Sequence, residues 1–507
     1  MVDQFNWILT IAIFFPIIGG ISLLLIPQKE YIKIFAILFG TIEFILCSYI
    51  FLFQFTNGIG GPVLVDLNST WFPTNIFNVQ YYLGVDGISA PFVLLTGLLG
   101  LISIFASWNL SNDHRIREHF MWLLILQGAV VGVFTSLDFF MFFIFWELEL
   151  IPMYFLISIW GSGRKHYSAM KFLIFTILGS AFMLVGVLGI YFSTDSFNMI
   201  ELPEKLATAK LIIPASVLFL LTIIGFAVKL PVFPLHTWLP DAHTDAPTAA
   251  SVMLAGVLLK MGGYGMLRVS ASMFPNELHQ FAWILALLGT INIIYGAVIT
   301  IRQTDLKRLI AYSSVSHMGF VLLGLSAASG AGVSIGITGA SMQMFTHGTI
   351  TGLLFLSIGF IYDRTHTRYI PDLSGLAQNT PFLATGLIIA GLASLGLPAT
   401  SGFIAEITIF LGAFQTWPIF TTISAFGVVL TAGYVLWMIQ RSLFQHKLEK
   451  FNTLTDASIG EMFPIIVLVI SIIGIGLGSF ALIISISVLN GFEQKLDEKI
   501  SNFDGHI

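Results

Sequence analysis

Stretches of roughly 20 apolar residues recur from residue 7 almost to the end of the chain, and no other feature limits its fold as strongly. A helix of that length crosses the hydrocarbon layer of a bilayer. Only 10% of the 507 residues are charged and 56% are hydrophobic, whereas a soluble domain carries about 25% charged residues. The sequence therefore predicts an all-α polytopic membrane protein with about fourteen transmembrane helices.

Turn-forming and charged residues set the boundaries of the predicted helices. The helices are expected at 7–26, 31–54, 87–108, 117–135, 139–160, 169–192, 211–228, 247–270, 279–300, 307–326, 334–361, 382–413, 418–440 and 461–489. The first stretch has no basic segment before it and no cleavage site after it, so we expect a retained span rather than a signal peptide. The only long connection, 56–84, contains no lysine or arginine and predicts an ordered external loop or hairpin.

Lysine and arginine are unevenly distributed between the two ends of the predicted helices. Cytoplasmic loops close to the membrane hold these residues in excess. The basic residues that follow odd-numbered helices are Lys29, Lys33, Arg115, Arg117, Arg164, Lys165, Lys171, Arg302, Lys307, Arg308, Arg364, Arg368, Arg441, Lys447 and Lys450. We therefore expect these loops to face the cytoplasm of a bacterial inner (plasma) membrane. Both termini, including a charged tail at 493–499, are then expected on the outer (periplasmic) side.

Composition excludes several classes of function. Cys47 is the only cysteine, so the chain cannot form an intrachain disulfide or a cysteine-ligated metal or iron–sulfur centre. The net charge of −5 is spread over the loops without a basic cluster, which excludes nucleic acid as a partner. The stretch 234–247 contains histidines and aspartates, but its prolines and short spacing favour a re-entrant connection over a metal site.

Two predicted helices are interrupted by proline near the membrane interior. Pro231 and Pro234 follow Lys229, and Pro398 lies near the middle of the stretch 382–413. Proline cannot donate a hydrogen bond to the carbonyl four residues earlier, so helices 7 and 12 must open there. Matching interruptions in two halves of a chain indicate inverted repeats with ion sites at the breaks.

The spacing of the breaks predicts a five-helix repeat, in which helices 4–8 correspond to helices 9–13. The chain would then divide into four parts. Residues 1–110 form the first three helices and the external loop, 111–272 the first repeat, 273–445 the second repeat, and 446–507 the last helix and tail.

Ionisable side chains inside the predicted helices are the candidates for function, because a charge at the bilayer centre costs about 2.5–3.5 kcal/mol on insertion scales. Glu147 lies among aromatic residues of helix 5, and Lys229 stands at the break of helix 7. On a regular helix Glu149 points about 200° away from Glu147, so the two cannot serve one site. We expect Glu147 to pair with Lys229, either as a proton-dependent switch or as a static brace between helices 5 and 7. Glu149 is expected to be structural.

Four further ionisable residues extend this row along the chain. They are Lys260 in helix 8, His317 in helix 10, His347 in helix 11 and Glu406 in helix 12. A buried lysine can lose its proton and histidine titrates near neutrality, so both suit proton transfer. The alternative for each histidine is a satisfied core residue. Glu406 is predicted to be an outlet gate, with a helix cap in a water-exposed loop as the alternative.

Other charged residues receive structural interpretations. Asp86 and Asp138 stand at helix starts, where the helix dipole favours a carboxylate. Glu43 lies in helix 2 and could equally pair with a neighbouring subunit. His236 and the prolines at the two breaks are assigned supporting roles.

Several stretches resemble the antiporter-like subunits of respiratory complex I, the NADH-quinone oxidoreductase. They are Trp146-Glu147-Leu148 and residues 226–247, 254–263 and 313–319, and the similarity extends over almost the whole chain. Residues 84–89, residues 362–368 and Glu406 are most similar to the M-type (chain 4) branch, because L-type and N-type subunits typically carry lysine at the position of Glu406.

The resemblance implies a role for each residue of the row. The input pair, the central proton carrier, the relay and the output residue correspond to Glu147 with Lys229, to Lys260, to His317 with His347, and to Glu406. The chain would be a proton-translocating subunit of an enzyme and would bind no cofactor itself. NADH, FMN, iron–sulfur clusters and quinone would lie on other subunits, and L-type and N-type subunits and the lipid bilayer would surround it.

Two alternatives predict different assemblies. A subunit of a multisubunit sodium/proton antiporter would keep the same glutamate and lysines without a redox partner. A solute transporter or a structural membrane scaffold would instead show a substrate pocket, or dispensable charges, at the two helix breaks.

Overall fold

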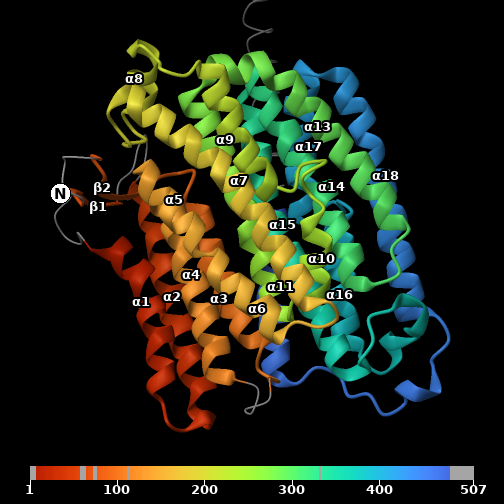
Figure 1. Ribbon diagram of the computed structural model, residues 1–507. Coiled ribbons are helices and arrows are strands. Elements are labelled where there is room, and N and C mark those ends of the chain that lie inside the picture. Colours follow the sequence, from red (N-terminus) through yellow and green to blue (C-terminus); the bar gives the residue numbers. More distant parts are fainter. Residues whose placement is uncertain (1–6, 58–63, 72–76, 111–114, 331–332, 480–507) are drawn as a thin grey trace, which may run out of the picture.

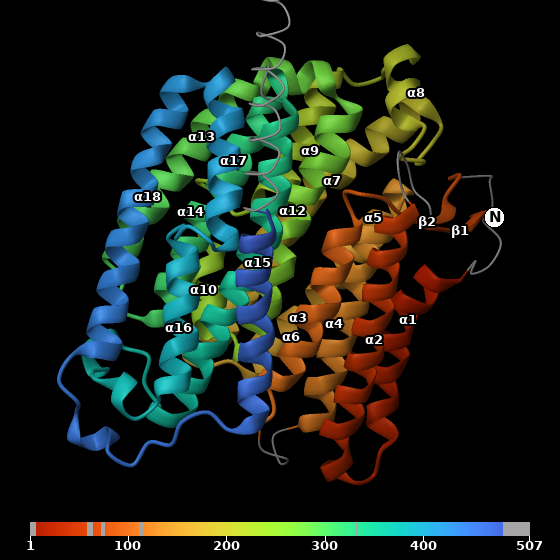
Figure 2. The same ribbon diagram turned by 180° about the vertical axis from the view of Figure 1, so that it is seen from behind.

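The computed structural model describes residues 7–57, 64–71, 77–110, 115–330 and 333–479, and shows a bundle of helices that stand side by side (Figures 1 and 2). Within these residues, 11 helices are long and apolar enough to cross a membrane. The shorter apolar helices α3 and α9, and the broken pair α16 and α17, bring the number of spans to the predicted fourteen. The predicted tail at 493–499 lies outside the described residues.

The first three spans carry a small β-hairpin at the end of the bundle that is opposite to the basic loops. The elements are α1 (Ile8–Ser22), α2 (Lys29–Asn57), β1 (Leu64–Thr70), β2 (Gln80–Val85) and α3 (Ala90–Ala106). The strands are antiparallel, with Leu64 opposite Val85 and Thr70 opposite Gln80, and the register is irregular between Asp66 and Asn68. The hairpin predicted between helices 2 and 3 is therefore confirmed.

The next part of the chain contains the first helix break. Its elements are α4 (Ile116–Thr135), α5 (Phe139–Leu148), α6 (Leu150–Trp160), α7 (Lys165–Thr194), α8 (Leu202–Thr208), α9 (Ala215–Lys229), α10 (Trp238–Asp245), α11 (Thr248–Met253) and α12 (Leu259–Gly265). Two π-helical turns, at 254–258 and 266–271, flank α12 within one continuous span.

The remaining part contains the second break. Its elements are α13 (Pro275–Ile301), α14 (Leu306–Ser326), α15 (Val333–Thr365), α16 (Pro381–Ser394), α17 (Ser401–Thr416), α18 (Pro418–Ile439) and a last span, Ile459–Ser479. Short 3-10 turns lie at 23–25, 327–329, 370–372, 376–378 and 449–451, and a π-helical turn at 440–444. The repeat boundaries at 111–272 and 273–445 stay predictions.

Proline determines where three of the spans are interrupted. As predicted, α9 ends at Lys229 just before Pro231, and α16 and α17 are separated at Pro398. A third interruption, at Glu149 between α5 and α6, was not predicted. Pro152 explains it, because it cannot donate to the carbonyl of Leu148.

The interior of the bundle is formed by three spans, 248–271, 306–329 and 334–365, which are almost completely buried. In the last span and the span that contains α18, in contrast, only 28% and 33% of the residues are buried. Side chains on these spans face other helices rather than lipid, so polar and ionisable residues can be accommodated there. Three of the predicted row, Lys260, His317 and His347, lie on these interior spans.

An ion pair ties the hairpin to one of these interior spans. Arg268 in the π-helical turn donates through both terminal nitrogens to the carboxylate of Asp86, at 2.7 Å each. Burial alone would raise the pKa of Asp86, but the hydrogen bonds and the charge of Arg268 hold it below its ordinary value. The structural role predicted for Asp86 is consistent with this contact.

We predict that Asp86→Ala destabilises the protein by about 3 kcal/mol, the low end of the range for removing one partner of a buried ion pair. Arg268 would be left buried without its counter-charge. Thermal unfolding of the purified protein measures the effect. Glu118→Ala, which breaks an exposed pair with Arg115, is the matched control and should stay within about 0.5 kcal/mol of the parent. Equal effects of the two substitutions would contradict the prediction.

Candidate functional site

A buried ion pair joins the interruption between α5 and α6 to the end of α9. The ammonium of Lys229, the last residue of α9, contacts the carboxylate of Glu149. Both side chains are almost completely removed from solvent. The aromatic rings of Trp146 and Phe172 lie 5.6 and 5.5 Å from the Lys229 nitrogen. Such rings exclude water and interact favourably with a cation.

The predicted contact between Glu147 and Lys229 is wrong, because another face of helix 5 points toward α9. Phe142 and Trp146 pack their rings against Phe226 of α9, at 6.4 and 5.7 Å. Glu149 follows Trp146 by three residues and so shares that face. Aromatic residues occur on every side of helix 5, so their spacing in the sequence does not identify this face. The predicted contact between helices 5 and 7 itself is confirmed.

Glu147 nevertheless remains close to the pair. It lies beside Ser180 of α7, its oxygen Oε1 is buried without a hydrogen-bond partner among the described residues, and its charge acts on Lys229 through space. Lys229 is therefore placed between two carboxylates, one in contact and one nearby. An arrangement of this kind offers a lysine two alternative partners.

Lys260 lies at the centre of the interior span between the two π-helical turns. Its amine contacts the carbonyl of Ala255 and lies 2.8 Å from the Nδ1 atom of His347. An ammonium can donate to a neutral imidazole nitrogen, and a neutral amine can accept from a protonated one. The contact therefore allows one proton to be shared between the two side chains. π-Helical turns often occur at functional sites.

The two histidines continue the row toward Glu406. The rings of His347 and His317 lie 5.5 Å apart, and His317 contacts Ser394 at 3.0 Å through Nε2. The Nδ1 atom of His317 lies 3.6 Å from Glu406. A small cavity of about 10 Å³, which these residues line together with Gln343, is the size needed for roughly one water molecule. The row predicted from Lys260 to Glu406 is thus continuous in space.

The break in helix 12 lets Glu406 approach His317. Gly396 has a φ of +77°, and a Cβ atom there would lie 2.8 Å from a carboxylate oxygen of Glu406. Glu406 itself lies inside α17 and is 6% exposed, so it is not a cap in a water-exposed loop. The turn at Pro398 separates α16 from α17 and so makes room for this carboxylate.

The break after α9 is stabilised by a residue that the sequence did not indicate. Asn292 of α13 donates to the carbonyl of Pro231 at 3.1 Å and accepts from the backbone N–H of Phe233 at 2.8 Å. An opened helix leaves backbone groups that must be paired inside a membrane. Pro234 follows in a cis peptide, and His236 packs beside Phe233 and Tyr295.

The polar residues that follow the break have separate partners. Asp241 pairs with Lys171 at 2.7 Å, and Asp245 accepts from Ser168 at 2.6 Å. His243 stacks on Phe355. Within the described part of the chain, no three histidine, cysteine, aspartate or glutamate side chains form a group that could hold a metal ion.

Two carboxylates outside the row have local roles. Asp138 caps α5 through the N–H groups of Phe140 and Met141 and also accepts from Gln80 of the hairpin. Glu43 is buried inside the chain, where the Cys47 thiol donates to it at 3.2 Å. The predicted alternative, a pairing of Glu43 with a neighbouring subunit, is therefore wrong.

The fold and the row of buried ionisable residues are those of an antiporter-like membrane subunit. Residues 136–431 match the family model described as NADH:quinone oxidoreductase/Mrp antiporter. The chain belongs to this family.

The chain is also similar to two individual oxidoreductase subunits. The chain is 42% identical over 487 residues to NAD(P)H-quinone oxidoreductase chain 4 1 of Synechococcus elongatus, covering 94% of this chain and 89% of that one. It is 40% identical over 489 residues to the chloroplastic chain 4 of Mesostigma viride, covering 94% of each.

Comparison with solved structures supports the same family assignment. A chain of respiratory complex I from Thermus thermophilus superposes with a TM-score of 0.83 at 29% identity, covering 92% of this chain and 95% of that one. A chain of the Mrp complex from Dietzia sp. gives a TM-score of 0.82 at 20% identity, covering 94% and 96%. The second likeness concerns the fold alone.

We predict that Gly396→Ala destabilises the protein by roughly 1–2 kcal/mol, because a Cβ atom is unfavourable at this left-handed backbone conformation and would press on Glu406. Thermal unfolding of the purified protein tests this. Gly433→Ala in α18 is the matched control, since a Cβ atom there meets nothing within 4 Å. A loss of stability in the control as large as that of Gly396→Ala would contradict the assignment.

Proposed function

We propose that this chain translocates protons as an antiporter-like membrane-arm subunit of a NADH:quinone oxidoreductase. The observation that carries the proposal is the continuous row of buried contacts from Lys260 through His347 and His317 to Glu406. The names of the relatives support the same assembly. Each residue of the row is of a type that can both take and release a proton.

The energy for translocation comes from redox chemistry on other subunits. The single cysteine of this chain is buried against Glu43 and cannot ligate a cluster. The iron–sulfur clusters therefore belong to other subunits, and we propose that NADH, flavin and quinone bind there as well. A change of charge or position in those subunits alters the electrostatic field at the buried charges of this chain.

Lys229 with its two carboxylates is the input switch. In contact with Glu149 the ammonium is stabilised by the opposite charge. When the pair opens, an ammonium in an apolar environment becomes unfavourable unless a second carboxylate takes over. Glu147 is placed to do so, and a transfer of Lys229 between the two glutamates changes the field at Lys260.

The output steps follow the row of contacts. Lys260 gives its proton to Nδ1 of His347 and becomes a neutral amine. His347 releases its other ring proton toward His317, with Gln343 and a water in the small cavity as possible hydrogen-bond partners. His317 passes a proton to the carboxylate of Glu406, which releases it to the outer side. Every step moves one proton from a donor to an acceptor, so charge is balanced.

The contact between Lys260 and His347 favours protons over sodium as the coupling ion. Sodium, a hard cation, binds oxygen ligands, whereas this step joins an amine nitrogen to an imidazole nitrogen. A subunit of a multisubunit sodium/proton antiporter is the second candidate, since the matched family also contains such subunits. The identity to chain 4 relatives favours the oxidoreductase.

The proposed location is a bacterial inner (plasma) membrane, with both termini on the outer side. The basic loops gather at one end of the bundle, and α8 and the hairpin lie toward the other (Figure 1). Basic loops face the cytoplasm. L-type and N-type antiporter-like subunits are the proposed neighbours within the membrane.

We predict that Glu147→Gln and Glu149→Gln each lower proton pumping by roughly tenfold or more, equivalent to about 1.4 kcal/mol in the barrier. Either substitution removes one of the two partners between which Lys229 moves. Pumping is measured in inverted membrane vesicles, with NADH-to-ferricyanide activity as the test of an intact peripheral part. Glu204→Gln, on the exposed α8, is the control and should pump normally. A loss in only one of the two variants would contradict the shared switch.

We predict that Lys260→Ala and Glu406→Gln stop pumping in sodium-free buffer while ferricyanide reduction by NADH continues. Each substitution interrupts the row of contacts at one end. Wild-type vesicles should acidify equally with and without added sodium. A requirement for sodium in the wild type would favour the antiporter alternative instead.

A further inference from the structure

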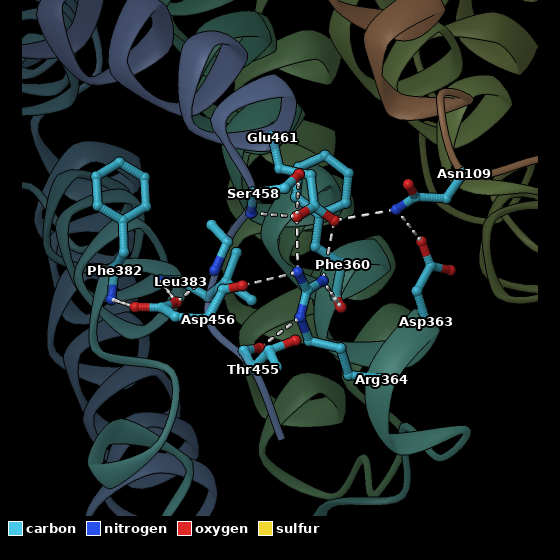
Figure 3. A network of polar contacts seen from close by, with 11 residues as sticks. Asn109, Phe360, Asp363, Arg364, Phe382, Leu383, Thr455, Asp456, Ser458 and Glu461 are labelled. Carbon is cyan, nitrogen blue, oxygen red and sulfur yellow. Dashed lines mark hydrogen bonds and ion pairs between the residues drawn. The ribbon is translucent and has the colours of Figure 1, made fainter. Parts of the chain in front are cut away.

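Two arginine–carboxylate pairs lie at opposite ends of the bundle. At the basic end, Arg364 of α15 donates to both carboxylate oxygens of Glu461 in the last span, at 2.9 and 2.6 Å (Figure 3). Both residues line a polar cavity of about 610 Å³, which is room for roughly twenty waters at about 30 Å³ each. At the end that carries the hairpin, Arg268 pairs with Asp86. The two pairs have the same chemistry, so any difference between them must come from what surrounds them.

Arg268 lies on the same span as Lys260, eight residues closer to the hairpin. Lys260 and Tyr264 are both in α12, and Arg268 follows in the π-helical turn at 266–271. Residues four apart on a helix share a face, and Nε of Arg268 donates to the hydroxyl of Tyr264 at 3.1 Å. Eight residues correspond to about 12 Å along a helix. A proton that left Lys260 toward the hairpin would therefore meet Tyr264 first and Arg268 next.

The ring of Tyr264 is enclosed by aromatic residues from three other helices. Its centre lies 6.0 Å from that of Phe92 in α3, 5.1 Å from Phe134 in α4 and 6.4 Å from Phe142 in α5. All four side chains are at most 1% exposed. Packing of this density leaves few voids as large as a water molecule. The rings therefore oppose the formation of a water chain between Lys260 and the hairpin.

The hydroxyl of Tyr264 is held by two hydrogen bonds. It donates its single proton to the carbonyl of Phe134 at 3.2 Å and accepts from Arg268. It can pass a proton on only if one of these bonds breaks. Arg268 cannot relay the proton, because a guanidinium is not deprotonated in proteins, and its positive charge is a barrier to protons and other cations. Asp86 accepts from both terminal nitrogens of Arg268 at 2.7 Å and so holds the guanidinium in place.

We propose that Tyr264 and Arg268, held by Asp86, form a proton seal on the outer side of Lys260. The inference rests on the proposed function, because it explains why the proton of Lys260 leaves through His347 and not directly along its own span. Without the seal, protons from the outer side would return to Lys260 and dissipate the gradient. Tyr264 and Arg268 are thus positioning residues, which determine the direction in which Lys260 gives up its proton.

The first test removes the charge of the seal. In the double variant Arg268→Gln with Asp86→Asn, neutral amides replace the ion pair, so neither partner is left as an unpaired charge. The purified complex is reconstituted into liposomes that contain a pH-sensitive dye, and an acid pulse outside imposes a proton gradient without NADH. Proton entry should be roughly tenfold faster or more than with the parent complex, because a barrier to cations has been removed. NADH-to-ferricyanide activity should be retained.

Two controls isolate the charge at this position. Arg364→Gln with Glu461→Gln neutralises a pair of the same chemistry at the basic end. Arg268→Lys keeps the positive charge opposite Asp86. Liposomes with either complex should be as tight to protons as those with the parent. A leak in either control as large as that of the neutral double variant would overturn the seal.

Removal of Lys260 distinguishes an opened seal from general damage to the bundle. When Lys260→Ala is added to the neutral double variant, proton entry should return to the rate of the parent complex, because the leak passes through the amine of Lys260. A general loss of packing would leak with or without this lysine. A leak that persists in the triple variant would therefore overturn the proposal.

The second test leaves the ion pair intact and does not depend on how its variants fold. Tyr264→Phe keeps the ring and removes only the hydroxyl, so the carbonyl of Phe134 and Nε of Arg268 each lose a partner and can bind water instead. Proton entry should become severalfold faster and should again depend on Lys260. Tyr369→Phe, at an exposed tyrosine, is the control and should stay tight. An unchanged rate in Tyr264→Phe would overturn the seal.

Failure of the seal and failure of the proposed function give different results. If Lys260→Ala and Glu406→Gln fail to pump while all variants of the seal stay tight to protons, the row stands and only the seal is wrong. If Lys260→Ala pumps normally, the proposed function itself is wrong.

Discussion

The cost of placing charge in hydrocarbon governs this structure. Each unpaired charge at the bilayer centre costs several kcal/mol, so a chain that keeps many ionisable residues in its interior must surround them with one another and with protein. The structure meets this constraint with three almost fully buried spans and an outer layer of apolar helices. The same cost makes the protonation of each buried group sensitive to its neighbours, which is the physical basis for moving a proton through the row.

The broken helices are the second consequence of that constraint. A helix that opens inside a membrane exposes backbone groups, and these must be paired without water. Asn292 pairs with both a donor and an acceptor beside Pro231. At the second break the backbone turns through Gly396, which leaves space for the carboxylate of Glu406. The breaks therefore bring Lys229 and Glu406 to positions that the regularly spaced side chains of a continuous helix would not occupy.

The features that sequence reasoning predicted are those that local chemistry determines. Apolar length determines the spans, and proline determines the breaks after Lys229 and at Pro398. Most of the row could also be named, because few ionisable residues occur within the spans. The partner of Lys229 could not be predicted by angular spacing alone, since Glu147 and Glu149 differ only in which neighbour each one faces. Aromatic residues lie on both faces of helix 5, so they do not separate the two glutamates either.

Contacts between segments that are distant in the sequence could not be predicted for a different reason. Asn292 looks ordinary in sequence, since a single asparagine in a helix has many possible roles. Its importance depends on α13, which approaches the stretch 229–233 only in the folded chain. The helix α15 carries His347, Phe355 and Asp363 and so connects the centre of the bundle with its basic end. In the proposed mechanism α15 holds His347 in contact with Lys260, so that what remains to be controlled is the charge on Lys260.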